Sequence, residues 1–372
     1  MRVLVVGGGI GGLCATLALR RDGVELEVLE RNPEWSVYGV GIIQPGNALR
    51  ALHSLGLAEA CVAAGHPILG SRTFLADGVT EVAHNAFPPL VPGLPPGNGL
   101  PRPRLHEILT TKVRESGATV RVGVTVTRIE NDPNGVAATL SDGSRSTWDL
   151  LIGADGLYSQ VREEVFDKDL VPRFTGQVCW RVNLPRLEGL DELHLYLGPW
   201  GSAGFVPLGE DLMYMLLIET PIDDWRAEVE RRGPAAVMRG RLEPFSGPVA
   251  QMREMVSDDD AIVLRPIENI LVPSPWHRDR VVLIGDAAHG MTPHCGQGAA
   301  QAVEDGIVLA EELSTSDSVA AALQAYTNRR FDRCRTILEG SEAIGRWEQD
   351  HTLDIDLAAT HQLVGMTAAS PI

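Results

Sequence analysis

The sequence predicts an α/β protein. A Rossmann-like dinucleotide-binding domain with a βαβ opening is interrupted by a mixed α+β domain and followed by C-terminal helices. Three observations predict this fold class. An apolar run over residues 2–6 leads directly into three glycines. Apolar runs at 149–154 and 280–285 indicate strands that return to the same parallel sheet. Longer strand patterns fill residues 173–219 between these two runs, so we expect a second lobe inserted into the first.

The other elements follow from hydrophobic periodicity and turn residues. Leucines at helical spacing (Leu13, Leu17) predict a helix after the glycines, and Asp132-Pro133-Asn134-Gly135 predicts a tight turn between strands. In chain order we expect a strand at 26–30, helices at 46–64 and 102–115, a Pro- and Gly-rich connection at 88–103, antiparallel strands at 118–130 and 136–140, strands at 193–197 and 212–218, helices up to about 255, and a helix near 298–313.

These elements suggest a division into domains. We assign residues 1–75, 100–170 and 275–315 to the dinucleotide-binding domain. Residues 76–99 and 171–274 form the second domain, which would hold a substrate, and residues 316–372 form a C-terminal helical region.

Composition excludes several classes of protein. The formal net charge of −17 disfavours nucleic acid or an anionic membrane as a partner, because both would repel the chain. We find no apolar stretch long enough to span a bilayer and no secretory leader, so we expect a cytoplasmic protein. The five cysteines are widely separated and form no CxxC pair or zinc-like cluster, so we expect no metal and no disulfide framework.

The first turn carries a dinucleotide fingerprint. Gly7-x-Gly9-x-x-Gly12 lies between a predicted strand and a predicted helix. Glycines there permit a tight turn and a close approach of the backbone to a pyrophosphate, whose charge the helix N-terminus stabilises. Glu30 ends the second strand at the offset where a carboxylate accepts a hydrogen bond from a ribose hydroxyl. The plain alternative is a glycine-rich turn with Glu30 exposed at the surface.

Two later segments resemble a known family. Residues 150–162 read Leu-Leu-Ile-Gly-Ala-Asp-Gly-Leu-Tyr-Ser-Gln-Val-Arg, and residues 281–289 read Val-Val-Leu-Ile-Gly-Asp-Ala-Ala-His, followed by Pro293 and by Gly-Gln-Gly-Ala-Ala at 296–300. With the first turn, they resemble the three signatures of FAD-dependent aromatic hydroxylases (flavoprotein monooxygenases) of the para-hydroxybenzoate hydroxylase type, in order and spacing up to about residue 340.

The resemblance implies a function. A single-component monooxygenase would use NADH or NADPH and dioxygen to hydroxylate a small aromatic or heteroaromatic molecule through a flavin hydroperoxide. FAD would be the cofactor, and the protein would be a monomer or a homodimer.

The resemblance also implies roles for individual residues. The ADP half of FAD would be held by Gly7, Gly9, Gly12 and Glu30, with Arg31 beside the adenosine. Arg102 would face the ribityl–phosphate region, Asp286 would accept a hydrogen bond from the ribityl chain, and Asp155 and Gly156 would serve both FAD and nicotinamide binding. Pro293 would lie near the flavin ring, and Gly298 and Ala299 would donate backbone N–H groups to its pyrimidine edge. Helix geometry supports the last role independently, because the first amides of a helix are unpaired. For Asp155 and Asp286 the alternative is capping of the turn that follows each strand.

The substrate side is less defined. Many phenol-hydroxylating relatives carry a histidine where Ser202 stands here, and we expect Ser202 on the substrate side. With Pro293, His294 is a candidate catalytic residue on the substrate side of the flavin, and the alternative is a loop or packing histidine. Trp200 and Tyr214 could line the pocket or be ordinary core. Arg181 could bind a substrate carboxylate or form a surface ion pair. His194 and the arginines at 329, 330, 333 and 335 are interpreted as solvated.

Three alternatives stay open on this scaffold. The first is other flavin chemistry such as epoxidation or halogenation, although no Trp-x-Trp-x-Ile-Pro segment of flavin halogenases is present. The second is an oxidase or a reductase without oxygen transfer. The third is a non-catalytic FAD-binding protein.

Overall fold

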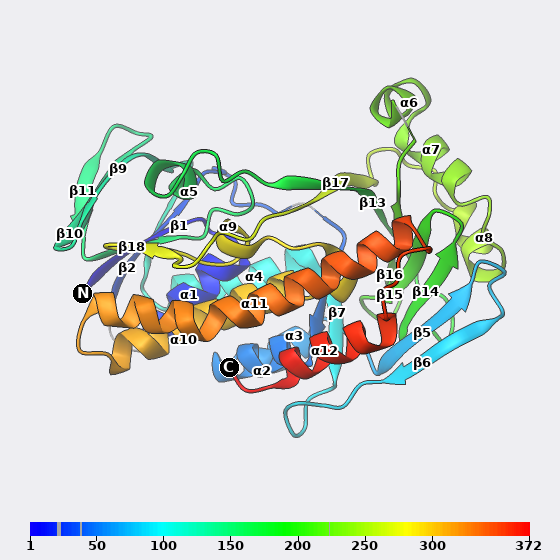
Figure 1. Cartoon of the computed structure of the whole chain (residues 1–372), viewed down its shortest axis with the longest axis horizontal. Helices are drawn as coiled ribbons and strands as arrows, with labels where there is room; N and C mark the ends of the chain where they lie inside the picture. The colour runs from blue at the N-terminus through cyan, green and yellow to red at the C-terminus, as the bar shows by residue number, and fades with distance from the viewer. Residues whose placement is uncertain (21–23, 38, 223) are drawn as a thin grey trace.

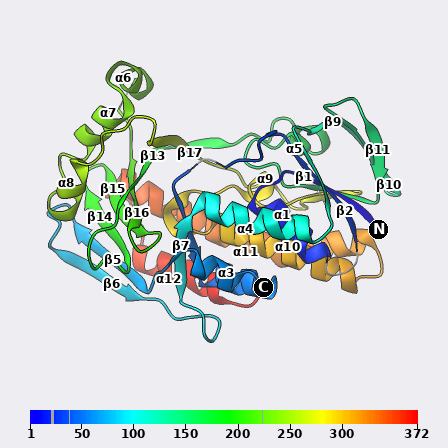
Figure 2. The ribbon, with the colours of Figure 1, turned by 180° about the vertical axis from the view of Figure 1, so that it is seen from behind.

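The computed structural model describes residues 1–20, 24–37, 39–222 and 224–372. It contains two large sheets, one at each end of an elongated molecule, with long helices running between them (Figures 1 and 2). This arrangement confirms the predicted α/β class with an inserted α+β part and C-terminal helices.

The first sheet is the nucleotide-binding one. Its six strands follow the order β18 (His277–Arg278), β19 (Val281–Leu283), β12 (Leu150–Gly153), β1 (Arg2–Val6), β2 (Glu25–Glu30) and β8 (Thr119–Val122). All neighbouring pairs are parallel except β18 with β19. Strands β1, β12 and β19 at the centre are buried apolar runs, as expected when both faces of a parallel sheet are covered.

Helices cover one face of this sheet and a small meander flanks the other. Helix α1 (Ile10–Arg20) packs against α10 (Gly298–Thr315) and α4 (Arg102–Glu115). The meander consists of β9 (Val126–Asp132), β10 (Gly135–Leu140) and β11 (Arg145–Trp148). Helix α5 (Gln160–Val165) follows β12 and packs against β9.

The second sheet has seven strands. Their order is β17 (Val263–Asn269), β13 (Arg173–Pro185), β16 (Leu212–Glu219), β15 (Gly201–Pro207), β14 (Leu193–Gly198), β5 (Gly70–Leu75) and β6 (Glu81–Ala86). Helices α6 (Trp225–Arg232), α7 (Pro234–Arg241) and α8 (Gly247–Arg253) gather at its end of the molecule (Figure 1). Met213, Met215 and Leu217 are buried in the core shared with these helices.

Shorter elements connect the two sheets. A three-stranded sheet joins β3 (Gly41–Pro45), β7 (Gly97–Pro101) and β4 (His66–Pro67), next to α2 (Gly46–Ser54) and α3 (Ala58–Ala63). Helix α9 (Asp286–His289) and the 3-10 turn η1 (Pro293–Cys295) lead from β19 to α10. Helix α11 (Val319–Gln349) runs from the first sheet to the second, and α12 (Leu357–Ala369) returns beside α2 (Figure 1).

Most predicted elements are present, with local differences. The helix predicted at 102–115 has these bounds in the structure. The helix predicted at 46–64 is two helices, because Gly56 adopts a left-handed φ of 70° between them. The strand predicted at 118–130 is likewise broken at Gly123, whose φ is 73°. Within the described residues, none of the helices combines the length and apolar character needed to cross a bilayer.

One strand lies on the other side of a proposed domain boundary. The division at residue 75 places Gly70–Leu75 in the dinucleotide-binding domain, but this strand, β5, pairs in parallel with β14 of the seven-stranded sheet. Its partner lies more than a hundred residues away in the chain, so local patterns do not reveal the pairing. The boundary proposed from the sequence therefore moves to a position before β5.

Candidate active site

Three turns lie side by side at one edge of the first sheet. Val6, Gly153 and Leu283 are the last residues of β1, β12 and β19, and they are in register with one another. The turns that follow are joined by backbone hydrogen bonds, from Ala154 N to Val6 O at 2.8 Å and from Ile284 N to Gly153 O at 3.0 Å. The carboxyl ends of parallel strands are where open α/β sheets bind ligands.

The glycines of the first turn differ in the space available for a side chain. Gly7 has a φ of 112°, and a Cβ there would overlap the carbonyl of Ala154. A Cβ on Gly12 would overlap the carbonyl of Gly7, so both glycines are required by close backbone packing. A Cβ on Gly9 would meet nothing within 4 Å. The open space at Gly9, in front of the α1 N-terminus, suits a phosphate group.

Glu30 is fixed beside this turn. Its carboxylate accepts hydrogen bonds from Gly8 N at 3.0 Å and from Asn32 N at 2.7 Å. The indole of Trp35 donates to Gly8 O at 3.0 Å and supports the turn from behind. The half-buried carboxylate lies where the fingerprint places a ribose ligand, whereas Arg31 is exposed.

Asp155 acts within its own turn. Its carboxylate accepts from Ser159 Oγ at 2.5 Å and from Val161 N at 3.1 Å, which caps α5. Burial raises the pKa of Asp155, and these hydrogen bonds oppose that rise. The side chain therefore makes the capping contacts that the sequence left as an alternative. Gly156, with a φ of 82° and open space around its Cβ position, leaves the backbone of this turn accessible.

Asp286 and Arg102 carry opposite charges that interact. Asp286 is exposed at the start of α9, after Gly285 in a left-handed conformation with φ of 59°. Arg102, at the start of α4, is half-buried. Burial and the positive charge of Arg181 lower the pKa of Arg102, while Asp286 opposes this effect. These charges therefore lie close together although Arg102, Arg181 and Asp286 are distant from one another in the chain.

The start of α10 has the predicted form. Gln297 is the N-cap, its carbonyl accepts from Gln301 N at 3.0 Å, and its side chain makes no capping bond to the helix backbone. The amides of Gly298 and Ala299 precede this first helical hydrogen bond, so they remain available to an anionic acceptor. Pro293, just before them, is exposed.

The inner face of the seven-stranded sheet carries polar side chains among apolar ones. Strand register places Arg181 and Cys179 of β13 on the same face as Ser202 of β15 and Tyr214 of β16. Tyr214 is buried, which raises the pKa of its hydroxyl, and the nearby charges of Arg181 and Arg102 oppose this rise. Arg181 Nε is buried without a hydrogen-bond partner among the described residues. Arg181 is thus not the surface ion pair that the sequence offered as an alternative.

Trp200 does not join this face. It lies in the turn between β14 and β15 and is 46% exposed. His194, interpreted from the sequence as solvated, is half-buried against the rings of Phe74 and Tyr196.

His294 lies against the C-terminal end of α11. Its side chain is 2% exposed, and Nε2 lies 3.5 Å from Glu348 Oε2. Glu348 also accepts from Ser202 Oγ at 3.0 Å and from Gln177 Nε2 at 3.4 Å. Sequence analysis missed Glu348 and Gln177, because neither belongs to a motif and α11 brings Glu348 to the sheet only in the folded chain.

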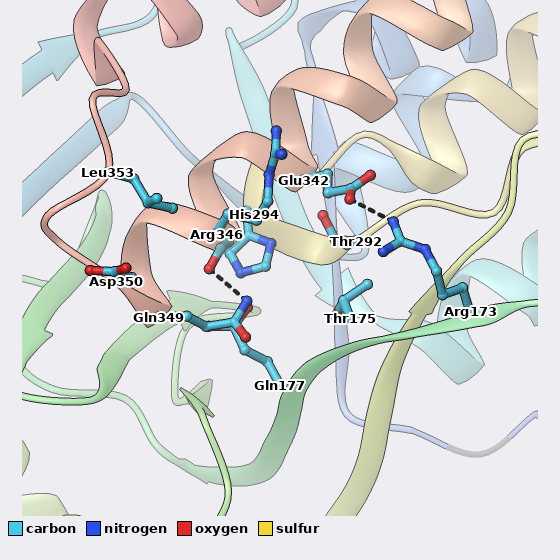
Figure 3. Close-up of a pocket in the computed structure, with 11 residues that line it drawn as sticks. Arg173, Thr175, Gln177, Thr292, His294, Glu342, Arg346, Gln349, Asp350 and Leu353 are labelled. Atoms are coloured by element: carbon cyan, nitrogen blue, oxygen red, sulfur yellow. Dashed lines mark hydrogen bonds and ion pairs between the residues drawn. The ribbon is translucent and has the colours of Figure 1, made fainter.

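A surface cavity of about 260 Å³ opens next to His294. Figure 3 shows His294 among side chains from α11 and β13, with the Arg173–Glu342 ion pair at one side. Thr292, Gln177 and Arg346 also line this cavity.

A buried ionic network holds the turn that follows β19. Arg330 of α11 is fully buried and donates to Asp305 Oδ1 and Glu304 Oε2, each at 2.7 Å. Asp305 in turn accepts from Gly285 N at 2.8 Å and pairs with His289 Nε2 at 2.6 Å. The interpretation of the arginine cluster as a solvated face is therefore wrong for Arg330 and also for Arg333, whose side chain is 9% exposed.

The same network contains a possible set of metal ligands. His289, Asp305 and Cys334 have ligand atoms within 4.8 Å of one another. The Arg330 guanidinium, however, donates to Asp305 and lies 3.4 Å from Cys334 Sγ. Since a fixed cation already neutralises these groups, we assign no metal to them.

Comparison with known proteins identifies the family of this chain. The sequence model of the family described as FAD binding domain matches residues 1–341. The chain belongs to this family.

Relatives of this FAD-binding chain are monooxygenases. It is 33% identical over 360 residues to aurachin C monooxygenase/isomerase of Stigmatella aurantiaca, covering 94% of this chain and 90% of the relative. It is 32% identical over 360 residues to 2-heptyl-3-hydroxy-4(1H)-quinolone synthase of Pseudomonas aeruginosa, with coverage of 94% and 90%. The structure of Klebsiella pneumoniae HpxO with FAD and uric acid superposes with a TM-score of 0.86 at 25% identity, covering 100% of this chain and 97% of that chain.

These findings confirm three predictions. The chain is a member of the FAD-dependent monooxygenase and aromatic hydroxylase family, FAD is its cofactor, and it is an enzyme of this class.

Proposed function

We propose that this enzyme uses NADH or NADPH and dioxygen to hydroxylate a small aromatic or heteroaromatic substrate between the FAD turns and the inner face of the seven-stranded sheet. The observation that carries the proposal is the position of Arg102, whose charge interacts with that of Asp286 on one side and with those of Arg181 and Tyr214 of the sheet on the other. A ligand that contacts this face would thus lie next to the cofactor edge. The relatives support the chemical class, because a quinolone and uric acid, named for two of them, are both nitrogen heterocycles.

Bound FAD would supply the redox chemistry with dioxygen. The chain supplies binding, orientation and charge. The amides of Gly298 and Ala299 would stabilise negative charge at the cofactor edge that they face. Gly9 would admit the pyrophosphate, and Glu30 would fix the ribose.

The polar face of the sheet would orient the substrate. Arg181 has an unpaired buried Nε and suits an acidic substituent or an enolate-like oxygen, which it can bind through parallel N–H groups. Tyr214 offers a hydroxyl that stays protonated, because burial raises its pKa. We propose His294 as the group that accepts a proton from a ring hydroxyl or amine, which makes the ring more nucleophilic. Pro293 would border the flavin ring.

The local charge predicts the kind of substrate. The chain as a whole carries a formal charge of −17, yet two guanidinium groups, those of Arg102 and Arg181, lie near each other here. These paired guanidinium groups favour an anionic or strongly polarised aromatic molecule over a neutral hydrocarbon.

A compound screen tests this function. The FAD-loaded enzyme is mixed with NADH or NADPH and a panel of aromatic acids, phenols and nitrogen heterocycles, and cofactor consumption and product mass are measured. We expect one chemical group of compounds to accelerate consumption and to gain one oxygen atom. Accelerated consumption with every compound unchanged in mass would contradict hydroxylation and would indicate an oxidase or a reductase.

A further inference from the structure

Glu348 is a nearly buried carboxylate without an arginine or lysine partner among the described residues. Its side chain is 11% exposed. Its two oxygens are approached by Ser202 Oγ, by Gln177 Nε2 and by the His294 ring. Removing a carboxylate from water is costly unless it is paired. Among these three neighbours, only His294 can carry a positive charge.

His294 is equally dependent on this contact. Neither ring nitrogen has a hydrogen-bond partner with good geometry among the described residues. The ring is confined by Gly345 of α11, where an added Cβ would lie 2.6 Å from His294 Cε1. Gly345 thus lets α11 approach η1 closely enough for Glu348 to lie beside Nε2. The imidazole is buried, and the packing of Gly345 fixes its orientation. Among the described residues, no neutral acceptor forms a hydrogen bond that would hold the ring in one tautomer.

We propose that Glu348 is a positioning residue that orients His294 and stabilises its protonated form. This inference rests on the proposed function, in which His294 takes a proton from the substrate. With the Nε2–H group directed at Glu348, Nδ1 is the free base. The substrate O–H or N–H bond breaks, an Nδ1–H bond forms, and the electron pair stays on the substrate, while Glu348 remains ionised.

Other charged groups near His294 compete weakly. Glu342 is paired with Arg173 at 2.6 Å, and Asp350 accepts from Thr352 N at 3.0 Å and from its hydroxyl. The titratable or charged groups around the ring are Arg173, Cys179 and Arg181 of β13, Cys295 of η1, and Glu342, Arg346, Glu348 and Asp350 at the end of α11. Among the described residues, Glu348 is the carboxylate within ion-pair distance of the ring.

The surface cavity gives the proton a route. His294 and Gln177 line this surface cavity together with Arg346 and Gln349 (Figure 3). Water in the cavity can reach the ring from the side of α11, so the imidazolium can lose its proton to solvent after each turnover.

The test measures the His294 pKa directly. Imidazole NMR signals of the FAD-loaded, substrate-free enzyme are titrated with pH, and the His294 signal is assigned by its loss in His294→Asn. An opposite charge in contact shifts a pKa by about 1–3 units, so we expect Glu348→Gln, which keeps an acceptor for Ser202, to lower the His294 pKa by at least about one unit. Glu339→Gln removes the same charge from an exposed position on the same helix and should leave the pKa unchanged.

A second variant separates charge from packing. Ser202→Ala removes a hydrogen bond to Glu348 but retains the Glu348 charge. The His294 pKa should therefore stay within about half a unit of wild type, which is smaller than the shift caused by one direct charge contact. An unchanged pKa in Glu348→Gln, or an equal fall in Ser202→Ala, would overturn the inference.

The activity readout distinguishes this inference from the proposed function. With a substrate from the screen, the acidic limb of kcat/KM should move to lower pH in Glu348→Gln by the shift seen in the NMR titration. A failed screen with an intact NMR shift would refute hydroxylation alone. Successful hydroxylation with no NMR shift would refute the role of Glu348 alone.

Discussion

Single residues at the first turn separate folding from cofactor binding. Gly7 and Gly12 are required because neighbouring carbonyl groups occupy the space of a Cβ, and Gly7 also has a left-handed φ. Gly9 has open space instead. In the folded chain without cofactor, the fingerprint glycines therefore serve two physical purposes, and substitution can distinguish them.

We expect Gly7→Ala and Gly9→Ala to differ. A left-handed backbone costs an L-residue roughly 1–2 kcal/mol, and the overlap with Ala154 O adds to this cost, so Gly7→Ala should lower both the melting temperature and the FAD content. Gly9→Ala should melt like the wild-type apoprotein but bind FAD at least about tenfold more weakly, which is 1.4 kcal/mol. Thermal melts and FAD fluorescence titrations measure both effects. Equal FAD affinity in Gly9→Ala and wild type would contradict the assignment of the open space to the pyrophosphate.

The unpaired Nε of Arg181 predicts a substrate-specific loss. Arg181→Met should leave FAD binding intact and lower kcat/KM for acidic substrates by about 10–100-fold, because a charged hydrogen bond is worth roughly 1.5–3 kcal/mol. Steady-state kinetics with an acidic compound and its neutral amide measure this effect. A similar loss for both compounds would show that Arg181 supports the sheet and does not bind the substrate.

At the scale of elements, helix α11 connects the turn after β19 to the seven-stranded sheet. Its N-terminal half places Arg330 in the network that holds Gly285 and His289 through Asp305. At its C-terminal end, Glu348 accepts a hydrogen bond from Ser202 of β15. One helix therefore contacts both the turn after β19 and the seven-stranded sheet. The distance and angle between these two parts depend on how α11 packs.

Buried and exposed arginines on this helix should differ in their effect on stability. Arg330→Met leaves Asp305 and Glu304 without their buried partner, so it should cost about 3–5 kcal/mol of unfolding free energy. Arg329→Met removes half-exposed ion pairs to Glu311 and Glu312 and should cost less than about 1 kcal/mol. Urea unfolding of the FAD-loaded proteins compares them. Equal costs would place Arg330 in a solvated position.

The network also predicts a dependence of stability on acid. Although burial alone would raise the Asp305 pKa, His289 and Arg330 lower it to about 2. A depressed pKa adds stability that is complete above the unfolded-state value near 4 and is lost as the pH falls through the folded value. We expect unfolding free energy to decline below about pH 4, by roughly 2 kcal/mol from this group. Urea unfolding at stepped pH measures the decline, and an equally steep decline in Asp305→Asn would contradict the assignment.

His289 should contribute in the opposite direction. Burial opposes its charged form, but Cys334 and Asp305 outweigh this effect and raise the His289 pKa well above its ordinary value. A raised pKa adds stability that is complete below the unfolded-state value of about 6.5 and is lost as the pH rises through the folded value. His289→Gln should therefore flatten the alkaline side of the same profile.

At the scale of the whole molecule, local signals and long-range contacts explain what the sequence could predict. The βαβ opening, the returns at β12 and β19, and the amides at Gly298 and Ala299 were predictable because each depends on a few adjacent residues. The pairing of β5 with β14 and the contact of Glu348 with Ser202 were not, because each joins distant segments. Arg330 was misread because a charged residue on a helix is usually solvated, and only the folded chain supplies its buried carboxylates.

Isotope labelling of the product tests the central claim most directly. The FAD-loaded enzyme is supplied with NADH or NADPH, a compound selected by the screen and ¹⁸O₂, and the product is analysed by mass spectrometry. If FAD and the polar face of the sheet act together as a hydroxylating site, the product gains one ¹⁸O atom from dioxygen. Recovery of all ¹⁸O in hydrogen peroxide or water, with the aromatic compound unlabelled, would contradict it.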